Sequence, residues 1–250
     1  MIMKEMHKKF LVLVATHGDE YFSIPLVKRL KRANPDRFDV EISNPLALKK
    51  RIRFIDCDLN RDAPGSKLAK QYEIRRANYI IEKSKQYEFV LDIHGADSNC
   101  GIFTIVTNPT PANLILAYLL PIKRIVIWGS RKNGHKFGSI SRFVNCGVSI
   151  ECGPKNSQSI KSQLSALIEK FLLSYALNQE TNDRELYQVI GKVSEKDISK
   201  TQMKNLEDFK KVKLNDQLFF PILVNQYSDE KIVCYKMRKI NFYERFSFDY

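Results

Sequence analysis

Residues 10–20 read FLVLVATHGDE, an apolar run that leads directly into a histidine, a glycine and two carboxylates. Five consecutive apolar residues, Phe10 to Val14, predict a short strand that is buried on both faces. His17 and Glu20 follow at the exit of this strand. A histidine and a glutamate three residues apart are a weak signal alone, because the backbone often satisfies a strand-end histidine. The stretch indicates a functional site only together with residues at the ends of other strands.

Strand-like and helical runs alternate along the first 175 residues. The predicted strands are residues 10–14, 38–42, 89–93, 102–106, 125–128 and 147–150. The predicted helices are residues 22–33, 68–84, 112–120 and 159–177. This alternation indicates an α/β sandwich with a mostly parallel central sheet.

The character of the chain changes after residue 178. A polar connector covers residues 179–185, and little helical periodicity follows it. The predicted strands there are residues 186–193, 218–224, 231–237 and 240–246. We therefore expect a catalytic α/β domain over residues 1–178 and a small β-rich C-terminal domain over residues 179–250.

The composition bounds the class of protein. The chain has 250 residues, of which 44% are hydrophobic, so it can bury a substantial core. Its 41 Lys and Arg residues against 28 Asp and Glu give a formal charge of +13. Such an excess suits a solvated lysine-rich surface, nucleic acid, an anionic surface or acidic small substrates. The chain contains no RNP motif, zinc finger or basic leucine zipper, which argues against nucleic acid.

Cysteine usage and hydropathy favour a cytoplasmic protein. Five cysteines form no CxxC pair, and an odd number cannot all pair within the chain. The first apolar run is too short for the core of a signal peptide. No apolar run approaches the roughly 18–20 residues that span a bilayer, so we expect no membrane segment.

Three predicted strands each end in a metal ligand or a carboxylate. His17 and Glu20 follow the strand over residues 10–14, His94 follows residues 89–93, and Glu151 follows residues 147–150. In an open α/β sheet, ligands gather at the carboxyl ends of the strands. Two histidines and one glutamate match a catalytic zinc site that keeps its fourth position open for water. The sequence therefore predicts a hydrolytic metal centre at this edge.

Polar residues that could serve this centre lie between and beside the ligands. Arg61 suits bidentate binding of a substrate carboxylate, and Asn60 adds a second polar contact. Arg53 could direct a positive charge at a developing oxyanion. The alternative is that these arginines only decorate a basic surface. Asp92 lies two residues before His94, so it could orient that ligand or form a salt bridge at the sheet edge.

Four motifs in order resemble the succinylglutamate desuccinylase/aspartoacylase family, relatives of the zinc carboxypeptidases. They are residues 17–20 (HGDE), 56–61 (DCDLNR), 92–94 (DIH) and 150–154 (IECGP). The resemblance covers roughly residues 10–155 and implies a zinc-carboxypeptidase-like α/β/α sandwich with a mostly parallel central sheet.

The resemblance also implies the parts of the reaction. One zinc ion per chain would be held by His17, Glu20 and His94. Glu151 would be the general base that takes a proton from a zinc-bound water and passes it to the leaving amine.

On the substrate side, the resemblance implies that Arg53 stabilises the oxyanion. Asn60 and Arg61 would hold a substrate carboxylate.

Two further family positions are less well defined in this sequence. The family has an arginine upstream of the catalytic glutamate that binds the distal acidic group, and here Arg142 and Arg131 are both candidates. The family's substrate-contacting tyrosine in the C-terminal domain is assigned to Tyr227. The reaction type therefore carries over better than the substrate.

Three functions remain open at this point. The leading hypothesis is a zinc-dependent amidohydrolase that removes the acyl group from an N-acyl amino acid, with an acidic amino acid favoured by the positive charge. The second is a carboxypeptidase-like peptidase. The third is a non-catalytic basic protein that binds anions or nucleic acid on the same fold. The acyl group, the amino acid, the pathway and any homo-oligomer are left open.

Overall fold

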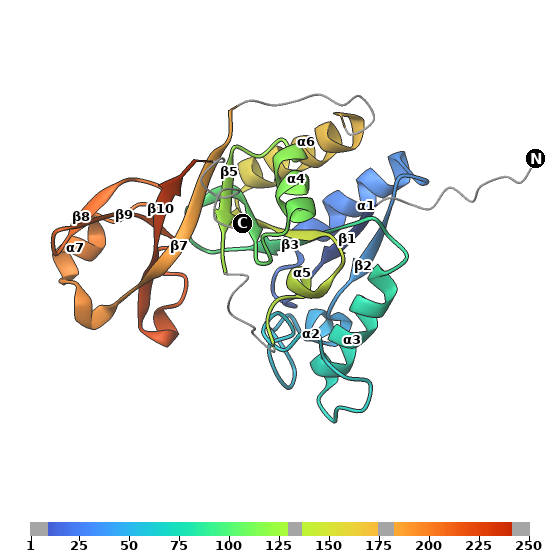
Figure 1. Cartoon of the computed structure of the whole chain (residues 1–250). Coiled ribbons are helices and arrows are strands. Elements are labelled where there is room, and N and C mark those ends of the chain that lie inside the picture. Colours follow the sequence, from blue (N-terminus) through green and yellow to red (C-terminus); the bar gives the residue numbers. More distant parts are fainter. Residues whose placement is uncertain (1–9, 130–136, 175–182, 242–250) are drawn as a thin grey trace, which may run out of the picture.

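A single mixed β-sheet organises the computed structural model of the chain, which describes residues 10–129, 137–174 and 183–241 (Figure 1). The strand order is β2-β1-β3-β6-β4-β5-β7-β10-β9-β8. The strands are β1 (Phe10–Val14), β2 (Phe38–Ile42), β3 (Phe89–Gly95), β4 (Gly101–Val106), β5 (Arg124–Ile127), β6 (Gly147–Gly153), β7 (Glu185–Ser194), β8 (Val212–Leu214), β9 (Gln217–Ile222) and β10 (Ile232–Ile240).

Strands β2, β1, β3 and β6 run parallel to one another, so their carboxyl ends meet at one edge. Strand β4 is antiparallel to β6, and β5 is parallel to β4. The prediction of a mostly parallel central sheet is thereby confirmed. The same pairing brings the carboxyl ends of β1, β3 and β6 together, as we predicted for the strands that carry the candidate ligands.

Helices cover both faces of this part of the sheet (Figure 1). The α-helices are α1 (Ile24–Ala33), α2 (Pro45–Lys50), α3 (Tyr72–Ser84), α4 (Pro111–Leu119), α5 (Ile140–Phe143), α6 (Gln158–Ser174) and α7 (Lys200–Lys204), and the 3-10 turns are η1 (Tyr21–Ser23), η2 (Glu195–Asp197) and η3 (Ser228–Glu230). Among these described segments, none has the length and apolar character needed to cross a membrane.

Strand β1 shows how the sequence pattern builds the layers. Its alternate residues Phe10, Val12 and Val14 belong to the core cluster that includes residues of α1, α4 and α6, whereas Leu11 and Leu13 belong to the cluster that includes residues of α3 and α5. All five residues are buried. A strand covered on both faces needs a continuous apolar run, as the sequence has here.

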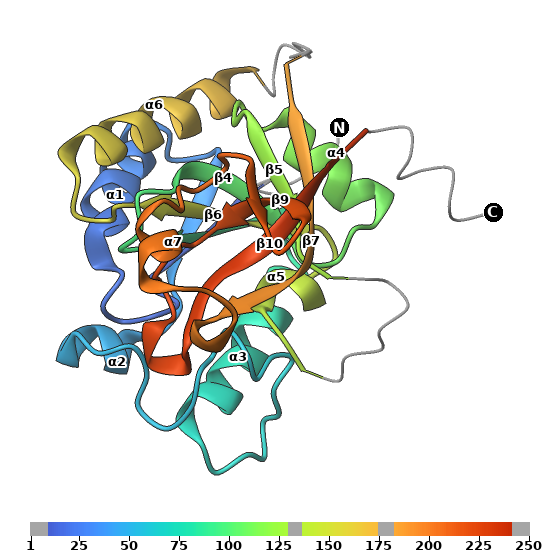
Figure 2. The same ribbon diagram turned by 90° about the vertical axis from the view of Figure 1, so that its left-hand side faces the viewer.

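The C-terminal strands extend the same sheet. Strand β7 pairs parallel with β5 and antiparallel with β10, which in turn pairs with β9 (Figure 2). A division of the chain at residue 178 stays a prediction, and residues 175–182 lie outside the described part of the chain.

Several predicted bounds differ from the observed ones. The helix expected over residues 68–84 begins at Tyr72, because Leu68 is 94% exposed and has no core to pack against. The strands expected over residues 231–237 and 240–246 are one strand up to Ile240, since a register shift between Lys236 and Met237 lets the pairing continue. Residues 242–246 and the last residues of the helix expected over 159–177 lie outside the described chain.

Candidate metal centre and substrate cavity

His17, Glu20 and His94 meet at the carboxyl ends of β1 and β3. All three are buried, and each offers a ligand atom within 4.8 Å of the others. Glu20 lies between the histidines: Oε1 is 2.6 Å from His17 Nδ1, and Oε2 is 3.2 Å from His94 Nδ1. The two imidazoles therefore present the same ring nitrogen, Nδ1, to one point.

Carboxylates hold the far nitrogen of each imidazole. His17 Nε2 lies 3.1 Å from Asp58 Oδ1, and His94 Nε2 lies 2.9 Å from Asp92 Oδ2. Thr16 donates to the other oxygen of Asp92 at 2.7 Å. Such partners fix the ring orientation and tautomer of metal-binding histidines. The two interpretations of Asp92 meet in one contact, because its hydrogen bond to His94 becomes an ion pair when His94 is protonated.

The electrostatics of this cluster suit a cation. Burial lowers the pKa of His17, but Glu20 and Asp58 outweigh burial and leave the pKa raised. Burial likewise opposes the charge on His94, yet Asp92 leads the interactions that hold its pKa well above the ordinary value. Burial raises the pKa of Glu20, and the two histidines outweigh it and keep the pKa well below its usual range. Two nitrogen donors and one carboxylate are the donor set of catalytic zinc sites, so these residues fit the ion.

Glycines allow the ligand loops to approach their neighbours. A Cβ at Gly18 would lie 2.2 Å from the backbone carbon of Ala47 in α2. A Cβ at Gly95 would lie 2.6 Å from the ring of Phe22, while the Gly95 N–H donates to Glu20 Oε2 at 3.1 Å. Any larger residue at either position would therefore displace the loop that carries a ligand.

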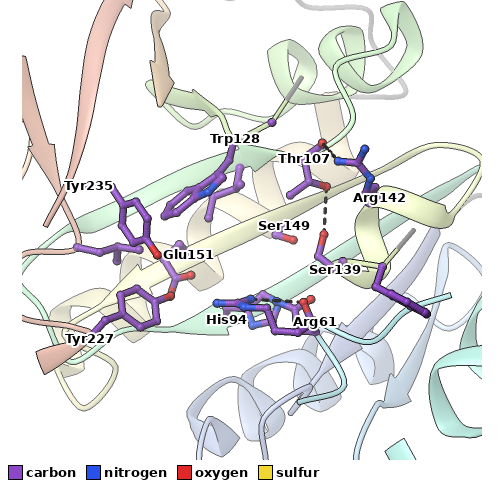
Figure 3. Close-up of a pocket in the computed structure, with 16 residues that line it drawn as sticks. Arg61, His94, Thr107, Trp128, Ser139, Arg142, Ser149, Glu151, Tyr227 and Tyr235 are labelled. Carbon is purple, nitrogen blue, oxygen red and sulfur yellow. Dashed lines mark hydrogen bonds between the residues drawn. The ribbon is translucent and has the colours of Figure 1, made fainter. Parts of the chain in front are cut away.

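Glu151 lies beside His94 in a cavity of about 370 Å³ (Figure 3). It lies on β6 in register with His94 on β3. Burial is the largest influence on Glu151 and raises its pKa to about 7. The cavity is lined by Asn60, Arg61, His94, Ile105, Thr107, Trp128, Gly129, Phe137, Gly138, Ser139, Arg142, Ser149, Glu151, Leu223, Tyr227 and Tyr235.

Asp58 organises the predicted polar residues of the 53–61 segment. Arg53 donates to Asp58 Oδ2 from Nε at 3.2 Å and from its terminal nitrogen at 2.9 Å, and it lies 3.9 Å from Glu20 Oε1. The Asn60 N–H donates to Asp58 Oδ1 at 2.8 Å. The same carboxylate thus contacts His17, Arg53 and Asn60, a role that no motif in the sequence predicts.

Arg61 and Tyr227, which are far apart in the sequence, line the same cavity (Figure 3). Burial lowers the pKa of Arg61, but nearby Tyr227 and Asp58 outweigh it and raise the pKa. Burial raises the pKa of Tyr227 to about 12. Arg142, one of the two candidates for the distal arginine, also lines the cavity. The other, Arg131, lies outside the described residues.

Several residues that line the rest of the cavity have no role predicted from the sequence. Trp128 and Tyr235 stack edge to face with ring centroids 4.5 Å apart, and the hydroxyls of Thr107 and Ser139 hydrogen-bond at 3.1 Å (Figure 3). Trp128 was expected only as the last residue of a strand. Thr107, Ser139 and Tyr235 come from separate elements and share no motif, so no spacing in the sequence could have grouped them.

Comparisons with known proteins find relatives of both the sequence and the fold. The family described as the succinylglutamate desuccinylase/aspartoacylase catalytic domain matches residues 7–175. A probable aspartoacylase of Prochlorococcus marinus strain MIT 9215 is 31% identical over 162 residues, which cover 58% of this chain and 54% of that protein. The chain thus spans about half the length of the curated relatives it matches.

Solved structures extend the likeness through the C-terminal strands. Murine aminoacylase 3 superposes with a TM-score of 0.73 at 20% identity, covering 95% of this chain and 97% of that one. The succinylglutamate desuccinylase of Chromobacterium violaceum gives a TM-score of 0.68 at 14% identity, covering 94% and 85%. At such identities the likeness establishes a shared fold, which confirms the expected α/β/α sandwich with appended β-strands.

Proposed function

The chain belongs to the succinylglutamate desuccinylase/aspartoacylase family, and from this premise we propose that it is a zinc-dependent amidohydrolase. Its substrate is an N-acyl amino acid, with an acidic amino acid favoured, and its reaction is hydrolysis of the amide bond. One observation carries the proposal: three buried ligand groups, His17, Glu20 and His94, lie within 4.8 Å of one another beside the half-buried carboxyl of Glu151.

His17, Glu20 and His94 would hold one zinc ion. When bound, the ion supplies Lewis-acid polarisation of the amide carbonyl and lowers the pKa of water. Asp58 and Asp92 keep the far ring nitrogens occupied, so that both imidazoles direct Nδ1 to the ion. Arg53, 3.9 Å from Glu20 Oε1, adds a fixed positive charge that stabilises the oxyanion.

Glu151 moves the proton. A pKa of about 7, raised by burial, lets this carboxyl accept a proton from the attacking water and release it near neutral pH. The proton then goes to the nitrogen of the leaving amine. The same residue thus acts first as a base and then as an acid.

The cavity supplies separate positive groups for an acidic substrate. Asn60 and Arg61 lie beside the metal cluster and would bind one carboxylate, with Tyr227 facing the same space. Arg142 lies on the wall formed with Thr107 and Ser139 and would bind the second acidic group (Figure 3). Two guanidinium groups in one small cavity support a dianionic substrate, and the net charge of +13 favours its approach.

A substrate panel tests the proposal. Purified protein supplied with zinc is offered N-acetyl-L-aspartate, N-succinyl-L-glutamate, N-acetyl-L-alanine and a short peptide, and release of the free amine is measured. We expect faster hydrolysis of the two N-acyl amino acids with acidic side chains than of N-acetyl-L-alanine, and no hydrolysis of the peptide. Hydrolysis of the peptide alone would replace the proposal with a peptidase. No turnover of any compound, with zinc bound, would refute amidohydrolase activity on this class.

A further inference from the structure

Polar contacts join the loops at the carboxyl ends of β1, β3 and β6. Lys155, in the loop after β6, lies 3.2 Å from Asp19 Oδ2 and 3.3 Å from Asp97 Oδ1. Asp19 belongs to the loop that carries His17 and Glu20, and Asp97 follows β3, which carries His94. The Lys155 side chain is only 14% exposed, whereas the side chains of Asp19 and Asp97 are 35% and 68% exposed, so the lysine end of the two ion pairs is the shielded one. The Lys155 ammonium group therefore links the three loops that surround His17, Glu20 and His94.

Gln226 connects this junction to the C-terminal strands. Its Oε1 accepts hydrogen bonds from the backbone N–H groups of Asp97 at 2.7 Å and Ser98 at 3.2 Å. These residues are more than 120 positions away in the sequence. Gln226 directly precedes Tyr227 in the turn between β9 and η3.

The turn over residues 223–227 needs such support. Leu223 and Asn225 have φ angles of 55° and 59°, in the left-handed region, which asparagine adopts readily but leucine disfavours. The Asp208 carboxylate accepts from the Val224 N–H at 3.0 Å, and the Asn225 N–H donates to Val233 O at 2.8 Å. These bonds tie the turn to the loop before β8 and to β10, whereas Gln226 ties it to the loop after β3.

We propose that Gln226 is a positioning residue for the substrate cavity, because it fixes the turn that presents Leu223 and Tyr227 relative to His94 and Glu151. The inference rests on the proposed function in one respect: Tyr227 contacts the substrate. Gln226 itself does not line the cavity and acts through its neighbour.

Substitution of Gln226 tests the inference in the full-length protein. Gln226→Leu removes the acceptor, whereas Gln226→Glu keeps an oxygen for the two N–H groups. With the panel compound hydrolysed fastest, we expect Gln226→Leu to raise KM about tenfold and to leave kcat and bound zinc nearly unchanged, because uniform substrate binding is lost. Gln226→Glu should restore KM to within about threefold of the parent.

Gln188→Leu is the matched control. Gln188 is half-buried on β7, and its side chain accepts from Arg238 rather than from a loop of the metal site. We expect no change in KM for this variant. An equal rise in KM for Gln188→Leu would overturn the inference, since any glutamine in these strands would then have the same effect.

A double variant separates positioning from general loosening. If Gln226 acts through the Tyr227 hydroxyl, Gln226→Leu added to Tyr227→Phe should raise KM by no more than about threefold beyond Tyr227→Phe alone. A further tenfold increase would contradict the proposal.

Hydrogen exchange supplies a readout that needs no substrate. The amides of Asp97, Ser98 and residues 223–227 should exchange faster in Gln226→Leu than in Gln226→Glu or Gln188→Leu. Unchanged exchange, or an unchanged KM in an active enzyme, refutes the positioning role. Inactivity of the parent protein on the whole panel refutes the proposed function alone, because the exchange experiment still reports on the turn.

Discussion

The two ends of the cavity are built in different ways. At the metal end, His17, Glu20 and His94 are buried and interlocked with two further carboxylates. At the far end, Trp128 and Arg142 come from separate elements and stand on a wall of aromatic rings and hydroxyls. The metal end is compact and close to the strand ends, whereas the far wall is assembled piecemeal. Under the proposed function, the groups that would set the reaction type lie close together, and those that would select the substrate are spread over the fold.

Loss of a metal ligand should have the largest effect at either end. We expect His94→Ala to reduce bound zinc from about one ion per chain to nearly none and to abolish turnover, because a three-ligand site cannot hold the ion with two. Metal analysis of the purified variant checks this. Full zinc occupancy in His94→Ala would show that other residues hold the ion.

Replacement of the base should separate chemistry from metal binding. Glu151→Gln keeps the volume of the side chain but removes the proton acceptor, so kcat should fall about 10³-fold while zinc content stays at the parental level. Steady-state kinetics and metal analysis on the same preparation measure both quantities. Substantial turnover in Glu151→Gln would remove this residue from the proton path.

A change at the far wall should alter selectivity rather than chemistry. Arg142→Met should raise KM for N-acetyl-L-aspartate by roughly tenfold or more, yet change KM for the monoanion N-acetyl-L-alanine by less than about threefold. Arg238→Met, which removes a guanidinium that bonds Gln188 outside the cavity lining, is the control. Equal losses for both substrates would mean that Arg142 supports the fold and not the acidic group.

The smallest effect concerns pH and the metal-free protein. The pKa values of His17 and His94 are raised in the fold above the ordinary 6.5, so folding favours their protonated forms. That stabilisation is complete below the ordinary value and is lost as the pH rises through the raised values. Chelator-treated protein should therefore have a lower urea midpoint at about pH 9 than at about pH 6. A variant with His17→Gln and His94→Gln should show a smaller difference.

The three candidate ligands could be predicted from the sequence because each lies at the end of a recognisable strand, whereas Asp58 lies in the irregular segment between α2 and α3 and could not be. Phe10 to Val14 is a continuous apolar run, which predicts the buried strand β1. His94 and Glu151 occupy equivalent positions on the parallel neighbours β3 and β6. Asp92 could be assigned to His94 by the two-residue repeat of a strand. These inferences needed only local periodicity and one rule about strand ends.

The far wall could not be predicted in the same way. Arg142 was one of two arginines in a segment whose spacing fixed neither, and the four-residue helix α5 that carries it is too short to show helical periodicity. Gln226 reaches a loop more than 120 residues away, a contact that depends on the closure of the whole sheet. Tertiary packing decides such positions, and a single sequence contains no local trace of them.

The parallel pairing of β5 with β7 also bears on any attempt to shorten the protein. Residues Ile125, Val126 and Ile127 of β5 are fully buried, and β7 covers the hydrogen-bonding edge of this strand. A fragment that ended before β7 would expose that edge together with its apolar side chains, a surface that templates pairing between chains. Such a fragment would keep every proposed zinc ligand and still be prone to aggregation. The C-terminal strands thus cover this edge as well as contributing Leu223, Tyr227 and Tyr235 to the cavity.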